Sequence, residues 1–86
     1  MATYRILYWQ ELPSQIRVEG DDGEDLNVEL PQKFLTRIDA LAVTRGLNSA
    51  DDYLAQWHWS EDEDRDGTAQ EVADAVVREL ELKFDD

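Results

Sequence analysis

Residues 15–46 read QIRVEGDDGEDLNVELPQKFLTRIDALAVTRG, and the period of their apolar residues changes once, at Pro31. Before Pro31, apolar and polar residues alternate on both sides of an Asp-Gly step at 22–23, which tolerates the positive φ of a tight hairpin. This alternation predicts two antiparallel strands with one face toward the core and one toward water. After Pro31, the spacing becomes that of a helix over about 32–45, with Gly46 just past its end. The predicted core-facing residues are Ile16, Val18, Leu26, Val28, Leu30, Phe34, Ile38, Leu41 and Ala42.

One strand is predicted before this region and a short helix directly after it. Residues 3–9 are aromatic and branched, as expected of a strand that is apolar on both faces. Leu12-Pro13-Ser14 are expected to turn the chain back. Ser49 begins a Ser-x-x-Asp motif that can cap a short helix carrying Tyr53 and Leu54.

The last third of the chain predicts a strand, a loop and a helix. Residues 56–60 alternate and are expected to form a fourth strand, whereas residues 61–66 are expected to form a charged loop. Thr68-Ala-Gln-Glu71 is a capping box for a last helix over about 69–84. The apolar stripe of that helix is Ala69, Val72, Ala73, Val76, Leu80 and Phe84.

These elements follow the order β-β-β-α-(α)-β-α, which is typical of the α+β class. We expect a two-layer sandwich in which a four-stranded, largely antiparallel sheet carries two main helices and one short helix on one face. A chain of 86 residues has the length of one small domain, so residues 1–86 are expected to form a single domain.

The composition is strongly acidic, with 21 Asp and Glu against 8 Lys and Arg and a formal net charge of −13. Such a charge repels phosphate backbones and anionic lipids, so neither nucleic acid nor a membrane surface is an expected partner. It attracts basic protein surfaces instead. The chain contains no cysteine, no basic-then-apolar leader and no apolar run of membrane-spanning length, so a cytoplasmic location is expected.

Residues 62–67 carry the most specific ligand motif. Asp62, Asp64 and Asp66 precede Gly67 with the D-x-D-x-D-G spacing of a calcium loop. The twelfth loop position is Ala73, where such loops carry a bidentate Glu. A small Ca²⁺-binding protein is therefore one alternative, and a solvated acidic loop before the last helix is the other.

The sequence assembles no catalytic set. His58 is the only histidine, no nucleophile is paired with it, and no glycine-rich loop could hold a phosphate or a cofactor. We therefore expect a protein that is not an enzyme and that needs no cofactor.

The aromatic residues indicate an interaction surface. Leu7 and Trp9 share one face of the first strand, and Trp57 and Trp59 share one face of the fourth. Because one layer of helices covers only one face of a sheet, these four residues are predicted to bind a protein partner or a second copy of the chain.

Four segments resemble the small bacterial domain family called virulence factor. They are Tyr4-Arg-Ile-Leu-Tyr-Trp-Gln10, Val28-Glu-Leu-Pro31, Tyr53-Leu-x-x-Trp57-x-Trp59 and Gly67-Thr-Ala-Gln-Glu-Val-Ala73. The likeness spans essentially the whole chain. In that family the domain occurs alone or at the end of longer proteins with a NifU-like scaffold domain and helical repeats. The resemblance implies an accessory or interaction role and supplies no catalytic residues.

Two further alternatives remain open. An accessory subunit of a cofactor-dependent enzyme complex is a variant of the interaction role. An acidic mimic of nucleic acid would need carboxylates in two regular rows, and the acids at 19–25, 61–66 and 79–86 suggest this by their number only.

Overall fold

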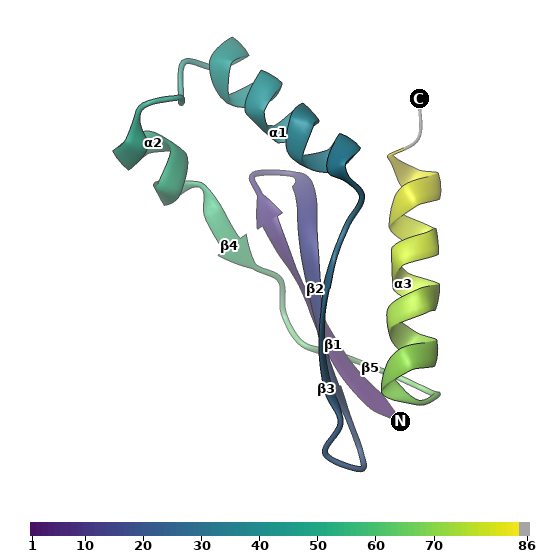
Figure 1. Cartoon of the computed structure of the whole chain (residues 1–86). Helices are drawn as coiled ribbons and strands as arrows, with labels where there is room; N and C mark the ends of the chain where they lie inside the picture. Colours follow the sequence, from purple (N-terminus) through teal and green to yellow (C-terminus); the bar gives the residue numbers. More distant parts are fainter. Residues whose placement is uncertain (85–86) are drawn as a thin grey trace.

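The structure is a computed structural model that describes residues 1–84, and it contains an antiparallel sheet and three helices (Figure 1). The predicted α+β class is confirmed. The strands are β1 (Ala2–Trp9), β2 (Leu12–Gly20), β3 (Asp25–Glu29), β4 (Trp57–Trp59) and β5 (Glu63–Arg65). The helices are α1 (Gln32–Thr44), α2 (Ala50–Ala55) and α3 (Ala69–Lys83).

The long strand β1 lies at the centre of the sheet. Its partner on one side is β2, which in turn pairs with β3, and on the other side it pairs with both β4 and β5. All of these pairings are antiparallel. The two short strands therefore share one edge of β1, while β3 forms the opposite edge of the sheet.

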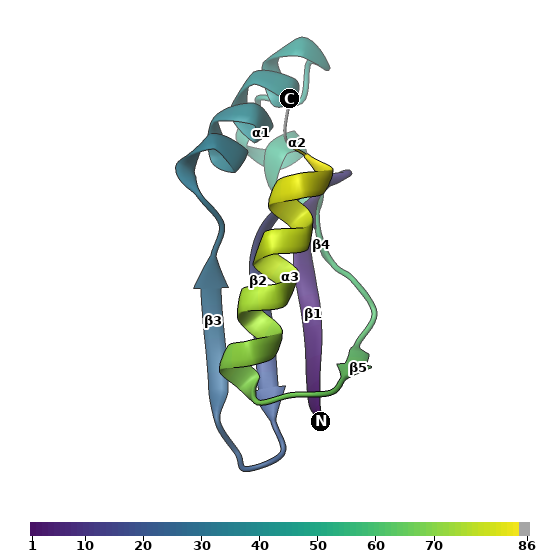
Figure 2. The same cartoon turned by 90° about the vertical axis from the view of Figure 1, so that its right-hand side faces the viewer.

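The larger core lies between the sheet and α3, which runs along one face (Figures 1 and 2). The alternation predicted for the hairpin is confirmed, because Ile16 and Val18 are buried while Arg17 and Glu19 are not. The predicted stripe of the last helix is also confirmed by burial. The buried residues of this core are Ala2, Ile6, Ile16, Val18, Leu30, Phe34, Ala69, Val72, Ala73, Val76 and Leu80.

A second, smaller core lies at the end of the sheet. Figure 1 shows α1 crossing this end from the side of α3 toward α2 and β4. Phe34, in the first turn of α1, belongs to the larger core, whereas Ile38 and Ala42 pack with Trp9 in the smaller one. By strand alternation, Trp9 lies on the face of β1 opposite to Ile6. Helices α1 and α2 thus cover one end of the sheet face that α3 does not cover.

Both predicted helix caps are present. The Thr68 hydroxyl accepts a hydrogen bond from the Glu71 amide (3.2 Å), and the Glu71 carboxylate accepts one from the Thr68 amide (3.1 Å). The Ser49 hydroxyl accepts a hydrogen bond from the Asp52 amide at the start of α2.

The prediction that residues 12–14 turn the chain was wrong. The turn lies at Gln10 and Glu11, between the paired residues Trp9 and Leu12. Gln10 has a φ of 53°, a conformation that usually requires glycine, so the sequence carries no turn signal there. Pro13 lies inside β2, where the register shifts at a bulge, a place that tolerates a proline.

The prediction that residues 61–66 form only a loop was also wrong, because Glu63–Arg65 form β5 against the start of β1. Side chains anchor this short pairing. Thr3 donates to Asp64 (2.7 Å), and Tyr4 donates to Glu63 (2.6 Å). These tertiary contacts outweigh the low strand propensity of an acidic segment.

Candidate interaction surface

The sheet face opposite α3, here called the open face, presents side chains in rows set by the strand register. The row nearest α1 runs Trp59–Leu7–Gln15–Glu29, and the next contains Arg5, Arg17 and Asn27. The last row runs Asp64–Thr3–Glu19–Asp25. The open face therefore grades from an apolar end beside the helices, through two arginines, to an acidic end.

Trp9 is not part of this surface, which corrects its prediction as an exposed docking residue. Its side chain is 0% exposed, because α1 and α2 close over the end of the sheet. The indole N–H donates to the Tyr53 carbonyl (2.9 Å), and the Tyr53 ring packs between the two indoles of Trp9 and Trp57. Trp57 is half-buried in the same cluster.

Leu7 and Trp59 remain on the open face and lie directly opposite each other in the β1–β4 register. Trp59 is 42% exposed, and Leu7 is half-buried. The Arg5 guanidinium lies over the Trp59 ring, 4.9 Å from its centroid. Of the four predicted docking residues, the structure thus leaves Leu7 and Trp59 together at the surface and places Trp9 and Trp57 in the smaller core.

Two arginines, Arg5 and Arg17, adjoin this apolar pair, and neither was predicted as a site residue. Arg5 and Arg17 are cross-strand neighbours, an arrangement in which like charges repel. Nearby carboxylates offset the repulsion: Arg17 pairs with Glu19 (3.4 Å) and Asp25 (3.6 Å), and Arg5 lies 3.9 Å from Asp62. Among residues 1–84, the Arg5 Nε is buried without a hydrogen-bond partner. Strand alternation could have indicated that both arginines share a face with Leu7.

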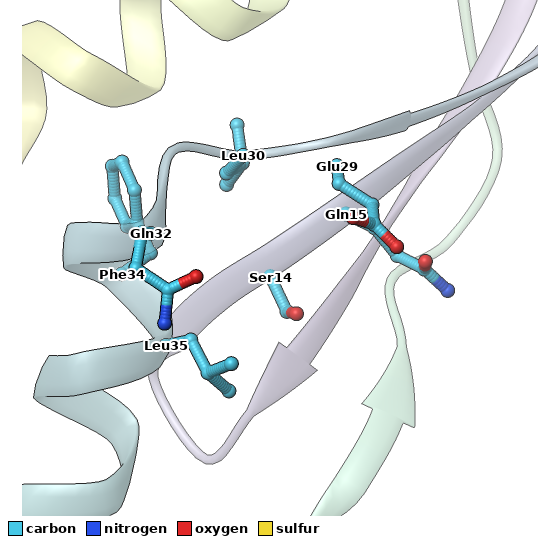
Figure 3. Close-up of a pocket in the computed structure, with 7 residues that line it drawn as sticks. All are labelled: Ser14, Gln15, Glu29, Leu30, Gln32, Phe34 and Leu35. Carbon is cyan, nitrogen blue, oxygen red and sulfur yellow. The ribbon is translucent and has the colours of Figure 1, made fainter.

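A pocket of about 130 Å³ borders the open face beneath the first turn of α1 (Figure 3). Figure 3 shows Gln15 and Glu29 beside each other on its sheet side and Leu35 on its helix side, while Phe34 turns toward α3. This volume is below the range usual for small-molecule sites. We therefore describe the pocket as a small hollow at the border of the open face, beside Leu35, and not as a ligand site.

His58 and Ser60 serve structural contacts at the β4 edge. The His58 Nε2 lies 2.9 Å from the Gln10 carbonyl oxygen, and its ring stacks on Tyr8 with centroids 5.8 Å apart. The Ser60 hydroxyl accepts a hydrogen bond from the Ile6 amide (2.8 Å). Gln10, which holds the strained turn, is thus secured by the β4 segment.

The carboxylates of Asp62, Asp64 and Asp66 do not converge as a calcium loop requires. Residues 63–65 are extended, and same-face side chains along a strand lie about 6.6 Å apart. Asp64 accepts the Thr3 hydroxyl, and Asp62 lies near Arg5. Within residues 1–84, no group of three His, Cys, Asp or Glu residues is arranged to hold a metal ion.

Tyr4 lies on the sheet face that α3 covers, packed against the larger core. Burial, followed by its hydrogen bond to Glu63, raises the pKa of Tyr4 to about 12. Elsewhere, ion pairs stabilise charged carboxylates: the Arg45 guanidinium lowers the pKa of Glu11, and the Arg65 guanidinium lowers that of Glu79. These shifts reflect contacts that hold turns and edges together.

Comparison with known proteins gives one match. A family model described as virulence factor matches residues 7–86. No curated protein and no solved structure matches the chain. None of the helices formed by residues 1–84 combines the length and the apolar character needed to cross a bilayer.

Proposed function

The chain belongs to the virulence factor family, and from this premise we propose that it is a non-catalytic accessory module that binds a protein partner through its open face. The observation that carries the proposal is the exposed pair Leu7 and Trp59, with Arg5 stacked on the indole. Trp and Arg are the residues that most often dominate the binding energy of protein interfaces.

The charge around this pair favours a partner with a basic surface. Five carboxylates lie on or beside the open face against two arginines, and the whole chain carries −13. Such a surface accelerates the encounter with a basic protein and slows the encounter with an acidic one. The carboxylates lie beyond the apolar pair on the same face, as a polar margin of the kind that many interfaces have.

Affinity capture with matched variants tests the proposal. Trp59→Ala removes the exposed indole of the open face, whereas Leu54→Ala removes a side chain that is 65% exposed on α2. We expect Trp59→Ala to abolish capture of a defined partner and Leu54→Ala to retain it. Equal capture by both variants, at equal thermal stability, would rule out the open face as the binding surface.

Size-exclusion chromatography separates a heterologous partner from a second copy of the chain. If the copies pair through the open face, Trp59→Ala will convert a dimer into a monomer. If the partner is another protein, both variants will elute as the wild type does.

A further inference from the structure

The edge strand β3 offers a second surface. It forms the edge of the sheet opposite to the β4 edge, where Trp59 lies. Among residues 1–84, β3 pairs only with β2, and its other edge has no strand beside it (Figure 2). A free edge presents a row of unpaired N–H and C=O groups, the feature by which proteins add an extended peptide to a sheet.

The register identifies which residues face the free edge. Gly20 donates to the Glu24 carbonyl (2.7 Å) and Leu30 donates to the Ser14 carbonyl (3.0 Å), so these residues bond inward across the β2–β3 pair. Inward-bonding and outward-facing residues alternate along an antiparallel strand. Asp25, Asn27 and Glu29 therefore direct their N–H and C=O groups away from β2.

A groove lies beside this edge on the face that α3 covers. It has a volume of about 350 Å³ and is lined by Val28 of β3 and by Asp74, Val77, Arg78 and Glu81 of α3. Val28 and Val77 are half-buried, so they give the groove an apolar floor. A strand added to β3 would direct every second side chain into this groove, because side chains alternate across a sheet.

The charged residues around the β3 edge and the groove indicate which side chains an added strand should carry. On the open face, its remaining side chains would lie beside Asp25 and Glu29, and the groove itself carries Asp74 and Glu81 against Arg78. Opposite charges across neighbouring strands stabilise pairing. The edge therefore matches an extended segment in which apolar residues alternate with Lys or Arg.

The same charges disfavour a second copy of the chain. Antiparallel pairing of two β3 edges centred on Asn27 would place Asp25 of one copy opposite Glu29 of the other. Like charges directly opposite each other destabilise a ladder and protect edges from self-association. A basic strand meets no such repulsion.

We propose that the β3 edge and the β3–α3 groove bind an extended basic–apolar peptide segment by strand addition. This edge is distinct from the pair Leu7 and Trp59, which lies toward the β4 edge, although Asp25 and Glu29 adjoin both surfaces. The proposal does not depend on the function proposed above.

A fluorescein-labelled synthetic peptide that alternates Lys and Val is the probe, with binding followed by fluorescence anisotropy. Asn27→Pro removes one outward N–H and no backbone bond to β2, and edge strands tolerate proline. It also removes the Oδ1 that accepts a hydrogen bond from Arg17 (3.2 Å), a loss that Asn27→Ala shares. Asn27→Ala is the matched control, because it changes the same side chain and keeps the N–H. We expect Asn27→Pro to weaken binding about tenfold or more, a loss of roughly 1.4 kcal/mol or more, and Asn27→Ala and Trp59→Ala to bind as the wild type does.

A second experiment changes the peptide and leaves the protein unchanged, so it tests strand addition even if Asn27→Pro fails to fold. A peptide of the same sequence with alternate backbone nitrogens methylated keeps its charge and loses donors for strand pairing. We expect it to bind about tenfold or more weakly than the parent peptide. Equal binding of the two peptides, equal binding by the two Asn27 variants, or no binding of the parent peptide would overturn the proposal.

Discussion

Trp9 and Trp59 show how two tryptophans two strand positions apart on one sheet take opposite roles. Trp9 is fully buried beneath α1 and α2, and its N–H bonds the Tyr53 carbonyl, whereas Trp59 is 42% exposed beside Arg5. The difference arises because α1 crosses only the end of the sheet and leaves the next row uncovered (Figure 1).

We predict that Trp9→Ala lowers the free energy of unfolding by about 3–5 kcal/mol, since it opens a cavity in the smaller core. Trp59→Ala should lower it by about 1 kcal/mol or less, the value of an exposed cation–π contact. Urea unfolding followed by circular dichroism measures both. Similar losses for the two variants would contradict the burial described for them.

The raised pKa of Tyr4 leads us to expect that the free energy of unfolding depends on pH in the alkaline range. Its pKa is raised to about 12 in the folded protein by burial and by the bond to Glu63, against about 10 in an unfolded chain. The neutral hydroxyl is thus favoured by folding, and its contribution to stability is complete below pH 10. It is lost as the pH rises from about 10 through 12, because the unfolded chain releases this proton first.

Tyr4→Phe carries no such proton, so its free energy of unfolding should fall less steeply between pH 9 and pH 11 than that of the wild type (a comparison at roughly constant salt). The other tyrosines titrate in both proteins and cancel in the comparison. Urea unfolding at each pH gives the two slopes. Parallel curves would show that folding leaves the Tyr4 hydroxyl unperturbed.

At the scale of elements, local signals predicted most of the fold. The alternation on either side of 22–23, the change of period at Pro31 and the capping box at Thr68 each marked an element that the structure contains. These signals are carried by neighbouring residues, so a sequence displays them directly.

Elements that depend on distant contacts could not be predicted in this way. The turn at Gln10 has no glycine, and its positive φ is held by Gln56 and His58, which lie 46 and 48 residues later in the sequence. Strand β5 forms because Thr3 and Tyr4 bind its acidic side chains. The same holds for the candidate site. The sequence places Trp9 and Trp59 on strands, but the exposure of Trp59 and the burial of Trp9 depend on where α1 crosses the sheet.

The capping box of α3 should contribute measurably to the stability of the fold. Thr68→Ala removes the hydroxyl that accepts the Glu71 amide, and we expect it to lower the free energy of unfolding by about 1 kcal/mol. Thr36→Ala is the control, since the Thr36 hydroxyl bonds only within α1 and alanine favours helix. It should change stability by less than about 0.5 kcal/mol. An effect of Thr36→Ala as large as that of Thr68→Ala would contradict the capping role.

At the scale of the whole molecule, a net charge of −13 on 86 residues opposes folding through self-repulsion. The exposed ion pairs, such as Arg45 with Glu11 and Arg65 with Glu79, are of the kind that contribute little. We therefore expect the melting temperature to rise by a few degrees when NaCl is raised from about 10 mM to about 200 mM, because salt screens the repulsion. Differential scanning calorimetry measures this, and a melting temperature that falls with salt would show that the ion pairs dominate.

The proposed function assigns separate roles to two sides of the molecule: α3 stabilises one sheet face, and the other face binds. Photocrosslinking in cells tests this division most directly, with p-benzoylphenylalanine placed at Gln15, which lies opposite Leu7 on the open face, and, as a control, at Leu54. The open-face account predicts a discrete crosslink to a basic protein from position 15 that is absent from position 54. No crosslink from position 15, or the same crosslinks from both positions, would contradict it.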